Sequence, residues 1–275
     1  MIDLHTHTTA SDGRCTPAEL VTRAAAAGVD VLSVTDHDTT AACGTASAAC
    51  AQAGIEFVPG IEITAVSNGA DVHVLGYFID PAAAPLGAFL SQQRRRRVDR
   101  VREMIERLAA HGIRLDADAV LRPGTDDRSK AVGRPWIARA LIAGGHVTST
   151  AEAFDRWLSN GRPAFVSRVG PTPEDVLHQI HEAKGIASLA HPGLLGHDDL
   201  ISGLADAGLD ALEAFHVQHR PEDTVRYLTL ADRFGLAITG GSDYHDDPEH
   251  GAVGPGGVSL PRELYEQLKS RKPSG

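Results

Sequence analysis

Short apolar runs alternate with alanine-rich segments along the first 80 residues, a pattern that predicts strands followed by helices. One helix begins after Thr16, where Pro17 and Glu19 supply a preferred first-turn residue and a capping box. A second helix is predicted over Ala41–Ala53. The third strand is either continuous or broken at Pro59–Gly60. The predicted strands are Met1–Leu4, Val31–Val34, Phe57–Val58 with Ile61–Thr64, and Val72–Tyr77.

The pattern changes after Asp80, where strand signals become rare. Apolar residues then recur at intervals of three and four, which predicts an amphipathic helix. They are Val98, Val101, Ile105 and Leu108. Two further helices are predicted around Trp136–Leu141 and Phe154–Leu158. We therefore expect an inserted helical subdomain over residues 94–163, which interrupts a barrel made of residues 1–93 and 164–275.

Strand and helix signals alternate again in the last third of the chain. The predicted elements are the helix Pro173–Lys184 with Thr172 as its N-cap, the strands Ile186–Ala190, Ala211–Phe215 and Leu236–Thr239, and the helix Glu222–Phe234. About seven strand–helix units around one insertion predict an α/β fold with a mainly parallel sheet. In a parallel barrel the chemistry lies at the carboxyl ends of the strands. The last residues, Ser270–Gly275, are expected to be a frayed tail.

Composition narrows the class of protein. The chain has 275 residues, 42% of them hydrophobic, and a net charge of −10, which argues against broad electrostatic binding of nucleic acid or anionic membranes. No apolar run is long enough to span a bilayer, and the first residues lack the pattern of a signal peptide. The three cysteines form no metal-thiolate or disulfide pattern. We expect a cytoplasmic protein that does not bind membranes.

The sequence contains 14 histidines, and many of them follow a predicted strand. His5 and His7 lie two residues apart in an extended segment, so their side chains point the same way. Asp12 alone reads as a turn residue, and Glu62 alone as a buried carboxylate with satisfied partners. Taken together, the strand-end residues predict a metal site. The candidate ligands are His5, His7, Asp12, His37, Glu62, His73, His191, Asp243 and His245.

Imidazoles and carboxylates without cysteine suit zinc, manganese or iron. The candidates outnumber the ligands that one tetrahedral ion takes, so two or three divalent ions are expected. Such clusters lower the pKa of a bound water and hold phosphoryl oxygens. Hydrolysis of a phosphate ester is therefore the reaction that this ligand set favours.

These motifs resemble the PHP family, the polymerase and histidinol phosphatase superfamily. The likeness covers the chain outside the insertion, and its motifs run in family order. Within the family, the chain is most similar to the stand-alone branch that removes phosphate from nucleoside 3′,5′-bisphosphates and degrades short RNA from its 5′ end. Ser11–Gly13, Gly133–Pro135 and Asn160–Val166 carry the likeness to that branch. The family motifs are Asp3–His7, Thr35–His37, Pro59–Glu62, His73, Ala190–Pro192 and Ser242–His245.

The resemblance implies a distorted (β/α)7 barrel with a helical lid and a centre of three ions. It also implies a hydroxide between the ions as nucleophile, Glu62, Asp243 and His245 as catalytic residues, and a nucleotide or short oligoribonucleotide as substrate. No obligate protein partner is expected. By the same resemblance, the first ion takes His5, His7, Glu62 and Asp243, the second shares Glu62 and adds His73 and His191, and the third takes Asp12, His37 and His245.

Substrate contacts are predicted from charge and position. Arg134 suits a phosphate, and otherwise it is a surface arginine at a helix start. His216 and His219 follow the sixth strand and either contact the substrate, protonate a leaving group or lie solvated in a loop. The run Arg94–Arg97 is either a solvated helix start or a guide for RNA. Asp36 either orients a ligand or caps a strand end.

Three other functions stay open at this point. A phosphatase of another small ester, such as histidinol phosphate, would use the same ions. An amidohydrolase acting on a C–N bond would need a lysine between its ions, and neither Lys130 nor Lys184 follows a strand. A non-catalytic binding module would have lost ligands, whereas every expected ligand is present.

Overall fold

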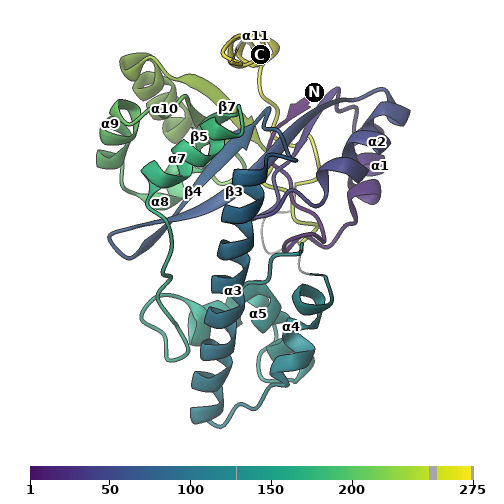
Figure 1. Ribbon diagram of the computed structural model, residues 1–275, viewed down its shortest axis with the longest axis vertical. Helices are drawn as coiled ribbons and strands as arrows, with labels where there is room; N and C mark the ends of the chain where they lie inside the picture. The colour runs from purple at the N-terminus through teal and green to yellow at the C-terminus, as the bar shows by residue number, and fades with distance from the viewer. Residues whose placement is uncertain (128, 248–252, 274–275) are drawn as a thin grey trace.

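A single sheet of seven strands, arranged in chain order, curls into a nearly closed barrel in the computed structural model, which describes residues 1–127, 129–247 and 253–273 (Figure 1). The ends of the sheet meet where Leu4 N donates to Gly240 O at 3.2 Å and where Thr6 bridges to Tyr244. The predicted seven-stranded α/β barrel is therefore confirmed. Its strands are β1 (Ile2–Asp3), β2 (Val31–Val34), β3 (Glu56–Ser67), β4 (Ala70–Tyr77), β5 (Ile186–Leu189), β6 (Ala211–His216) and β7 (Ala237–Gly241).

The sheet is parallel except at β4, which runs antiparallel to both β3 and β5. Asn68 and Gly69 join β3 to β4 in a two-residue hairpin, and both have positive φ, 50° and 79°. That conformation is typical of an Asn-Gly hairpin turn. Because β4 is reversed, residues near its amino end lie at the end of the barrel where the other strands have their carboxyl ends. We call this end of the barrel the rim.

The third strand is continuous through Pro59–Gly60. A Cβ at Gly60 would lie 2.9 Å from Thr35 Cγ2, so only glycine allows β2 to approach this closely. Pro59 pairs with Val34 without breaking the parallel ladder. Of the two alternatives that the sequence left open, the continuous strand is therefore the one observed.

Helices cover the outside of the barrel, and the predicted caps at Thr16 and Thr172 are both present as capping boxes. The barrel core contains strand residues such as Ile61, Leu75 and Leu212 together with helix residues such as Ile180. Part of the expected C-terminal tail is helical, because α11 extends to Ser270, and residues 274–275 lie outside the described part. The covering helices are α1 (Pro17–Ala26), α2 (Cys43–Ala53), α7 (Pro173–Glu182), α8 (Pro192–Leu195), α9 (Asp199–Asp206), α10 (Pro221–Phe234) and α11 (Arg262–Ser270).

The long helix α3 (Ala84–Ala110) joins the barrel to a helical segment at the lower end of the molecule in Figure 1. Leu86 and Leu90 of α3 pack into the barrel core, whereas Val101 and Met104 belong to a second hydrophobic cluster. The change from one core to the other therefore occurs within a single helix. The other helices of this segment are α4 (Ala117–Asp126), α5 (Arg134–Ala143), α6 (Thr150–Ala153) and the π-helix η1 (Phe154–Leu158).

Within the described ranges, none of the helices combines the length and the apolar character that crossing a membrane requires.

Candidate metal centre

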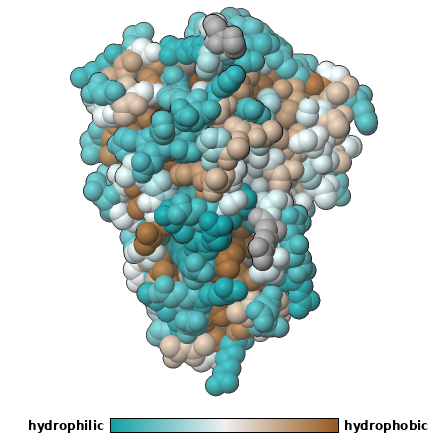
Figure 2. All heavy atoms as spheres, viewed as in Figure 1, coloured by the Kyte–Doolittle hydropathy of each residue, from teal (hydrophilic) through white to brown (hydrophobic). Residues whose placement is uncertain are grey.

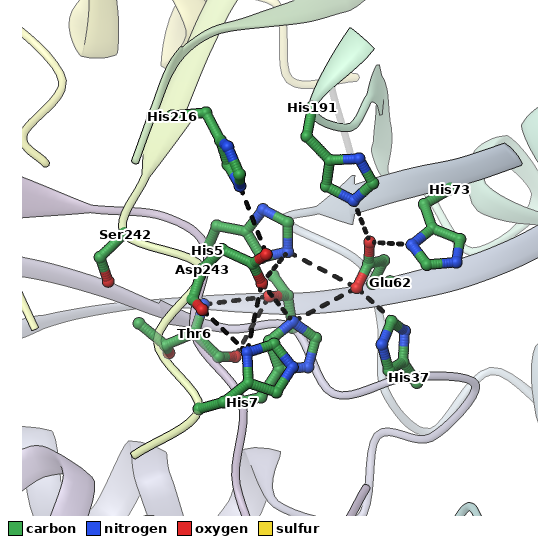
Figure 3. Close-up of polar contacts among 12 residues, drawn as sticks. His5, Thr6, His7, His37, Glu62, His73, His191, His216, Ser242 and Asp243 are labelled. Atoms are coloured by element: carbon green, nitrogen blue, oxygen red, sulfur yellow. Dashed lines mark hydrogen bonds and ion pairs between the residues drawn. The ribbon is translucent and has the colours of Figure 1, made fainter. Parts of the chain in front are cut away.

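Glu62, on β3, is the central carboxylate of the rim (Figure 3). Its Oε1 lies 2.7 Å from His73 Nδ1 and 3.1 Å from His191 Nε2. Its Oε2 lies 2.9 Å from His37 Nδ1 and 3.3 Å from His7 Nε2. One side chain that is 1% exposed therefore faces imidazoles carried by segments far apart in the sequence.

Asp12 gathers a second group on one side of Glu62. Its Oδ1 lies 3.3 Å from His245 Nε2 and 3.8 Å from His7 Nδ1, and its Oδ2 lies 3.6 Å from His37 Nε2. The four residues offer ligand atoms that all lie within 4.8 Å of one another. Three of these residues, Asp12, His37 and His245, are the set that the family resemblance assigns to one ion.

Asp243, which follows β7, gathers a third group. Its Oδ1 lies 3.3 Å from His5 Nε2 and 3.2 Å from His7 Nε2, and its Oδ2 lies 3.3 Å from His216 Nε2. His5, His216 and Asp243 form one potential ligand set, and His5, His7 and Glu62 form another. The structure thus brings all nine predicted ligands to one rim and adds His216 to them.

The chemistry of this donor set fits divalent cations. Several buried nitrogens and one carboxylate oxygen have no hydrogen-bond partner among the described residues. A buried polar atom without a partner is costly, and a cation would satisfy these atoms together. The atoms are His5 Nε2, both ring nitrogens of His7, His37 Nδ1, His73 Nδ1 and Glu62 Oε2.

Burial and neighbouring charges shift the pKa values of two rim histidines in opposite directions. Burial alone would lower the pKa of His7, but the neighbouring carboxylates of Asp243 and Glu62 outweigh it and raise that pKa to about 10. Burial dominates at His37 and lowers its pKa to about 4, in spite of the nearby carboxylates Glu62 and Asp12. Burial would raise the pKa of Glu62 and Asp243, yet the surrounding imidazoles hold both well below the usual range. The carboxylates are therefore ionised, as metal ligation requires.

Comparison with known proteins assigns this chain to a family. A model of the PHP domain matches residues 3–134. A 3′,5′-nucleoside bisphosphate phosphatase of Chromobacterium violaceum is 35% identical, over 98% of this chain and 97% of its own. The chain belongs to the PHP family. The resemblance inferred from the motifs is confirmed, and the chain is a metal-dependent phosphoesterase.

Other similar proteins match along most of their length. A 5′-3′ exoribonuclease of Salmonella typhimurium is 36% identical over 88% of this chain and 84% of its own. A Bifidobacterium adolescentis protein with a provisional assignment as a metal-dependent phosphoesterase has a TM-score of 0.90 and 31% identity, covering 99% of this chain and 96% of its own. An amidohydrolase of Chromobacterium violaceum, solved with bound sulfate and no metal, has a TM-score of 0.85 and 33% identity, covering 99% and 98%.

Two buried carboxylates support the PHP site without having been predicted. Glu213 Oε1 lies 2.9 Å from His5 Nδ1, and its Oε2 accepts from His191 N at 2.7 Å. Asp3 accepts from the Ser242 backbone and hydroxyl and from the His5 backbone. Both side chains are fully buried. A charged residue inside each apolar run was the signal that could have revealed them.

Asp36 supports the loop that follows His7, and its predicted part in orienting a ligand stays a prediction. It accepts from Thr8 N at 2.8 Å, from Thr8 Oγ1 at 2.6 Å and from Ser11 Oγ at 2.6 Å. These bonds hold the loop between His7 and Asp12.

The predicted substrate contacts lie in three different settings. Arg134 Nη2 bonds Asp71 Oδ2 at 3.3 Å, and its guanidinium lies over the Phe154 ring. His216 lies against Asp243, inside the ligand rim. Both ring nitrogens of His219 are engaged by backbone, Nδ1 with Ala214 O at 3.0 Å and Nε2 with Gly193 N at 3.2 Å. Their roles toward substrate stay predictions.

Proposed function

We propose that this chain removes a terminal phosphate from nucleoside 3′,5′-bisphosphates and also shortens RNA that carries a 5′-phosphate. The observation that carries the proposal is a full ring of imidazoles and carboxylates around Glu62, in a chain that aligns end to end with a bisphosphate phosphatase. The similarity to an exoribonuclease supports the activity on RNA. The substrate is then a nucleotide or a short oligoribonucleotide.

Two or three divalent ions, Mn, Fe or Zn, are the proposed cofactors, because imidazole and carboxylate ligands suit these metals. Bound there, such ions would supply an activated water and neutralise charge on the phosphoryl oxygens. The proposed ligands are His5, His7, Asp12, His37, Glu62, His73, His191, Asp243 and His245.

The chain's own residues would orient the substrate and handle protons. Glu62, Asp243 and His245 are proposed as catalytic residues, since each lies among the donors at the centre of the rim. Glu213 would fix the ring of His5 so that Nε2 faces the rim. His216, whose Nε2 lies 3.3 Å from Asp243 Oδ2, would hold a proton near the leaving group.

Residues 94–163 are proposed to be an inserted helical subdomain that acts as a lid. Arg139 Nη2 donates to Asp12 O at 3.3 Å, and Ala131 N donates to Ala10 O at 2.9 Å. These contacts tie the segment to the loop that carries a proposed ligand. The three cysteines are all unpaired and buried, which favours a reducing compartment, and we propose the cytoplasm.

The name of one structural neighbour favours a second candidate, hydrolysis of a C–N bond. Against it, the group between the histidines of this rim is the carboxylate of Glu62, where a carbamylated lysine would otherwise be needed. A panel of substrates separates the two candidates.

The first experiment measures phosphate release by protein purified with Mn²⁺. The panel holds adenosine 3′,5′-bisphosphate, 5′-AMP, histidinol phosphate and a 5′-phosphorylated short RNA. We expect selective release from the bisphosphate and stepwise shortening of the RNA. Preference for histidinol phosphate would overturn the nucleotide assignment, and no release from any member would overturn phosphoesterase activity on these esters. Asp243→Asn, with the same fold by circular dichroism, should be inactive on all of them.

A further inference from the structure

A groove lies between α3 and the end of α4. Its volume of about 540 Å³ is within the range of roughly 300–1,000 Å³ that is typical of ligand sites. Figure 2 shows hydrophilic residues gathered over the middle of α3, where this groove runs. We call it the α3–α4 groove, and its charged lining residues are Arg94, Arg95, Asp99, Arg102 and Lys130.

The positive charge on the walls of the α3–α4 groove is only partly neutralised. Asp99 is the one carboxylate among its described lining residues, against four cationic side chains. Within the described ranges, no carboxylate forms an ion pair with Arg95, Arg102 or Lys130. Asp127 lies near Lys130, but its carboxylate already accepts two hydrogen bonds from the loop that follows it. Three cations are therefore left for an anionic ligand.

Two other exposed arginines of the helical segment do have acidic partners. Arg107 Nη2 lies 2.7 Å from Glu103 Oε1, and Arg156 Nη1 lies 2.6 Å from Glu152 Oε1. The net charge of the chain is −10, so its surface as a whole repels a polyanion. An extended anion can then bind only where the sign of the charge is locally reversed, as it is in the α3–α4 groove.

The spacing of the cations suits a chain of phosphates better than a single anion. Arg95 and Arg102 are both exposed and lie seven residues apart, on the same face of α3. That separation is two helical turns, or roughly 10 Å along the axis. One strand of a nucleic acid helix carries a phosphate about every 3.4 Å, so this span matches about three phosphates.

The α3–α4 groove begins beside the metal centre but outside it. Arg94 Nη1 donates to Asp38 O at 3.0 Å, and Asp38 directly follows the proposed ligand His37. The segment that forms the other wall is tied to the barrel where Ala131 N donates to Ala10 O at 2.9 Å. Because the groove is next to a ligand loop and not among the ligands, only a substrate that extends beyond the rim can fill it.

We propose that the α3–α4 groove binds the phosphodiester backbone of RNA, downstream of the 5′-terminal nucleotide that lies at the metal centre. Contacts of this kind are made to phosphates and carry no sequence preference. A nucleoside bisphosphate ends before the groove and does not use it. The inference rests on the proposed function and adds to it the surface that distinguishes an RNA chain from a mononucleotide.

The test compares an RNA chain with substrates too short to fill the groove. We would measure kcat and KM of the metal-loaded enzyme for adenosine 3′,5′-bisphosphate, a 5′-phosphorylated dinucleotide and a 5′-phosphorylated RNA. The RNA has roughly 20 nucleotides, more than single-strand binding folds usually cover. Fluorescence anisotropy of the same RNA on the Asp243→Asn background measures binding apart from hydrolysis.

The variant that tests the groove is Arg95→Gln/Arg102→Gln. Arg114→Gln/Arg122→Gln is the matched control, because it removes the same charge from exposed positions of the helical segment that do not line the groove. If the groove variant does not fold, Lys130→Gln allows the same comparison from the opposite wall.

We expect the KM for RNA to rise by roughly 3- to 30-fold in the groove variant, because two exposed charge contacts are lost. The kinetics on the bisphosphate and the dinucleotide should not change, and the control should resemble the wild type. The salt dependence of RNA binding should also flatten, by about 1.4 in the slope of log affinity against log salt, since each phosphate contact of a single strand contributes about 0.7.

Three results would overturn the inference. They are an equal loss on the bisphosphate and on RNA, an RNA affinity that the groove variant leaves unchanged, and an equal loss of RNA affinity in the control. A wild type that hydrolyses the bisphosphate but neither binds nor shortens RNA overturns it too. A wild type inactive on every substrate overturns the proposed function itself, and the anisotropy of the RNA on the two variants then still decides whether the groove binds it.

Discussion

Replacing Glu213 by glutamine should weaken metal binding and leave the packing of the barrel core intact. The carboxylate is fully buried and uses both oxygens, one for His5 Nδ1 at 2.9 Å and one for His191 N at 2.7 Å. Glutamine keeps the shape but has only one oxygen that can accept. Its amide NH₂ must then face either the His5 ring or the His191 backbone. In the first case His5 keeps a proton on Nε2 and cannot bind a cation there.

The magnitude follows from the bond that is lost. A hydrogen bond to a charged group contributes about 1.5–3 kcal/mol, which corresponds to roughly 10- to 100-fold in affinity. Mutations of groups that orient metal ligands typically cost a similar factor, about 10–100-fold. We therefore expect the dissociation constant of Mn²⁺ to rise by that factor in Glu213→Gln.

The assay is a competition titration of Mn²⁺ against a chelating dye, paired with phosphate release as a function of Mn²⁺ concentration. The Mn²⁺ concentrations at the midpoints of the titration and of the activity curve should rise by the same factor. The value of kcat at saturating Mn²⁺ should fall by a smaller factor than the affinity for Mn²⁺. Glu106→Gln, an exposed change on α3, is the matched control. A folded Glu213→Gln protein with wild-type midpoints would refute the argument that this carboxylate orients His5.

Three further changes test the fold and the centre. A Cβ at Gly241 would overlap the His5 backbone and lie 2.6 Å from His5 Cβ, so Gly241→Ala should lower the unfolding free energy in urea by more than about 2 kcal/mol. Gly44 is the control, because a Cβ added at this position of α2 would meet no atom within 4 Å. Gly44→Ala should leave the unfolding free energy unchanged or raise it by up to about 1 kcal/mol. Similar losses of stability at both glycines would contradict this account. The hydrogen bond to Asp210 raises the pKa of His181, so its stabilising effect is full below about pH 6.5 and is lost as pH rises through the raised value. Because the pair is partly exposed, His181→Gln should cost only about 0.2–1 kcal/mol near pH 5 and nothing near pH 9, and a pH-independent cost would count against the ion pair. Finally, chelation with EDTA should lower the melting temperature and Mn²⁺ should restore it, since an ion at about 100 times its Kd adds about 2.7 kcal/mol; a melting curve insensitive to both would argue against a bound cation.

The meeting of the candidate ligands at one rim could be predicted, because residues that directly follow strands can be recognised in the sequence. His5, His7 and His191 each follow an apolar run, and parallel strands bring their carboxyl ends to one rim. His73 reaches the same rim for a different reason, since β4 is antiparallel and His73 is near its amino end. The Asn68–Gly69 pair between two apolar runs was a hairpin signal that predicts this reversal.

The supporting carboxylates were not predictable in the same way. Glu213 is a single charged residue in a strand, and its partner His5 is 208 positions away along the chain. Neither spacing nor periodicity relates two such residues, because their contact exists only once the barrel closes. Asp3 is similar, since the Ser242 groups that it accepts from belong to the opposite end of the chain.

For the arginine run of α3, the helical periodicity predicts which member is buried. Arg97 lies four residues before Val101, so it belongs to the buried face that the apolar stripe predicts. A buried arginine needs a carboxylate, and Arg97 Nε bonds Asp38 Oδ2 at 2.5 Å, one residue after His37. The run is thus not wholly solvated, because Arg97 ties α3 to the loop that follows His37. A contact of its other members with RNA stays a prediction. Arg97 lies between Leu90, which packs in the barrel core, and Val101, which packs in the second hydrophobic cluster, so its bond to Asp38 fixes α3 to the barrel where the helix passes from one core to the other.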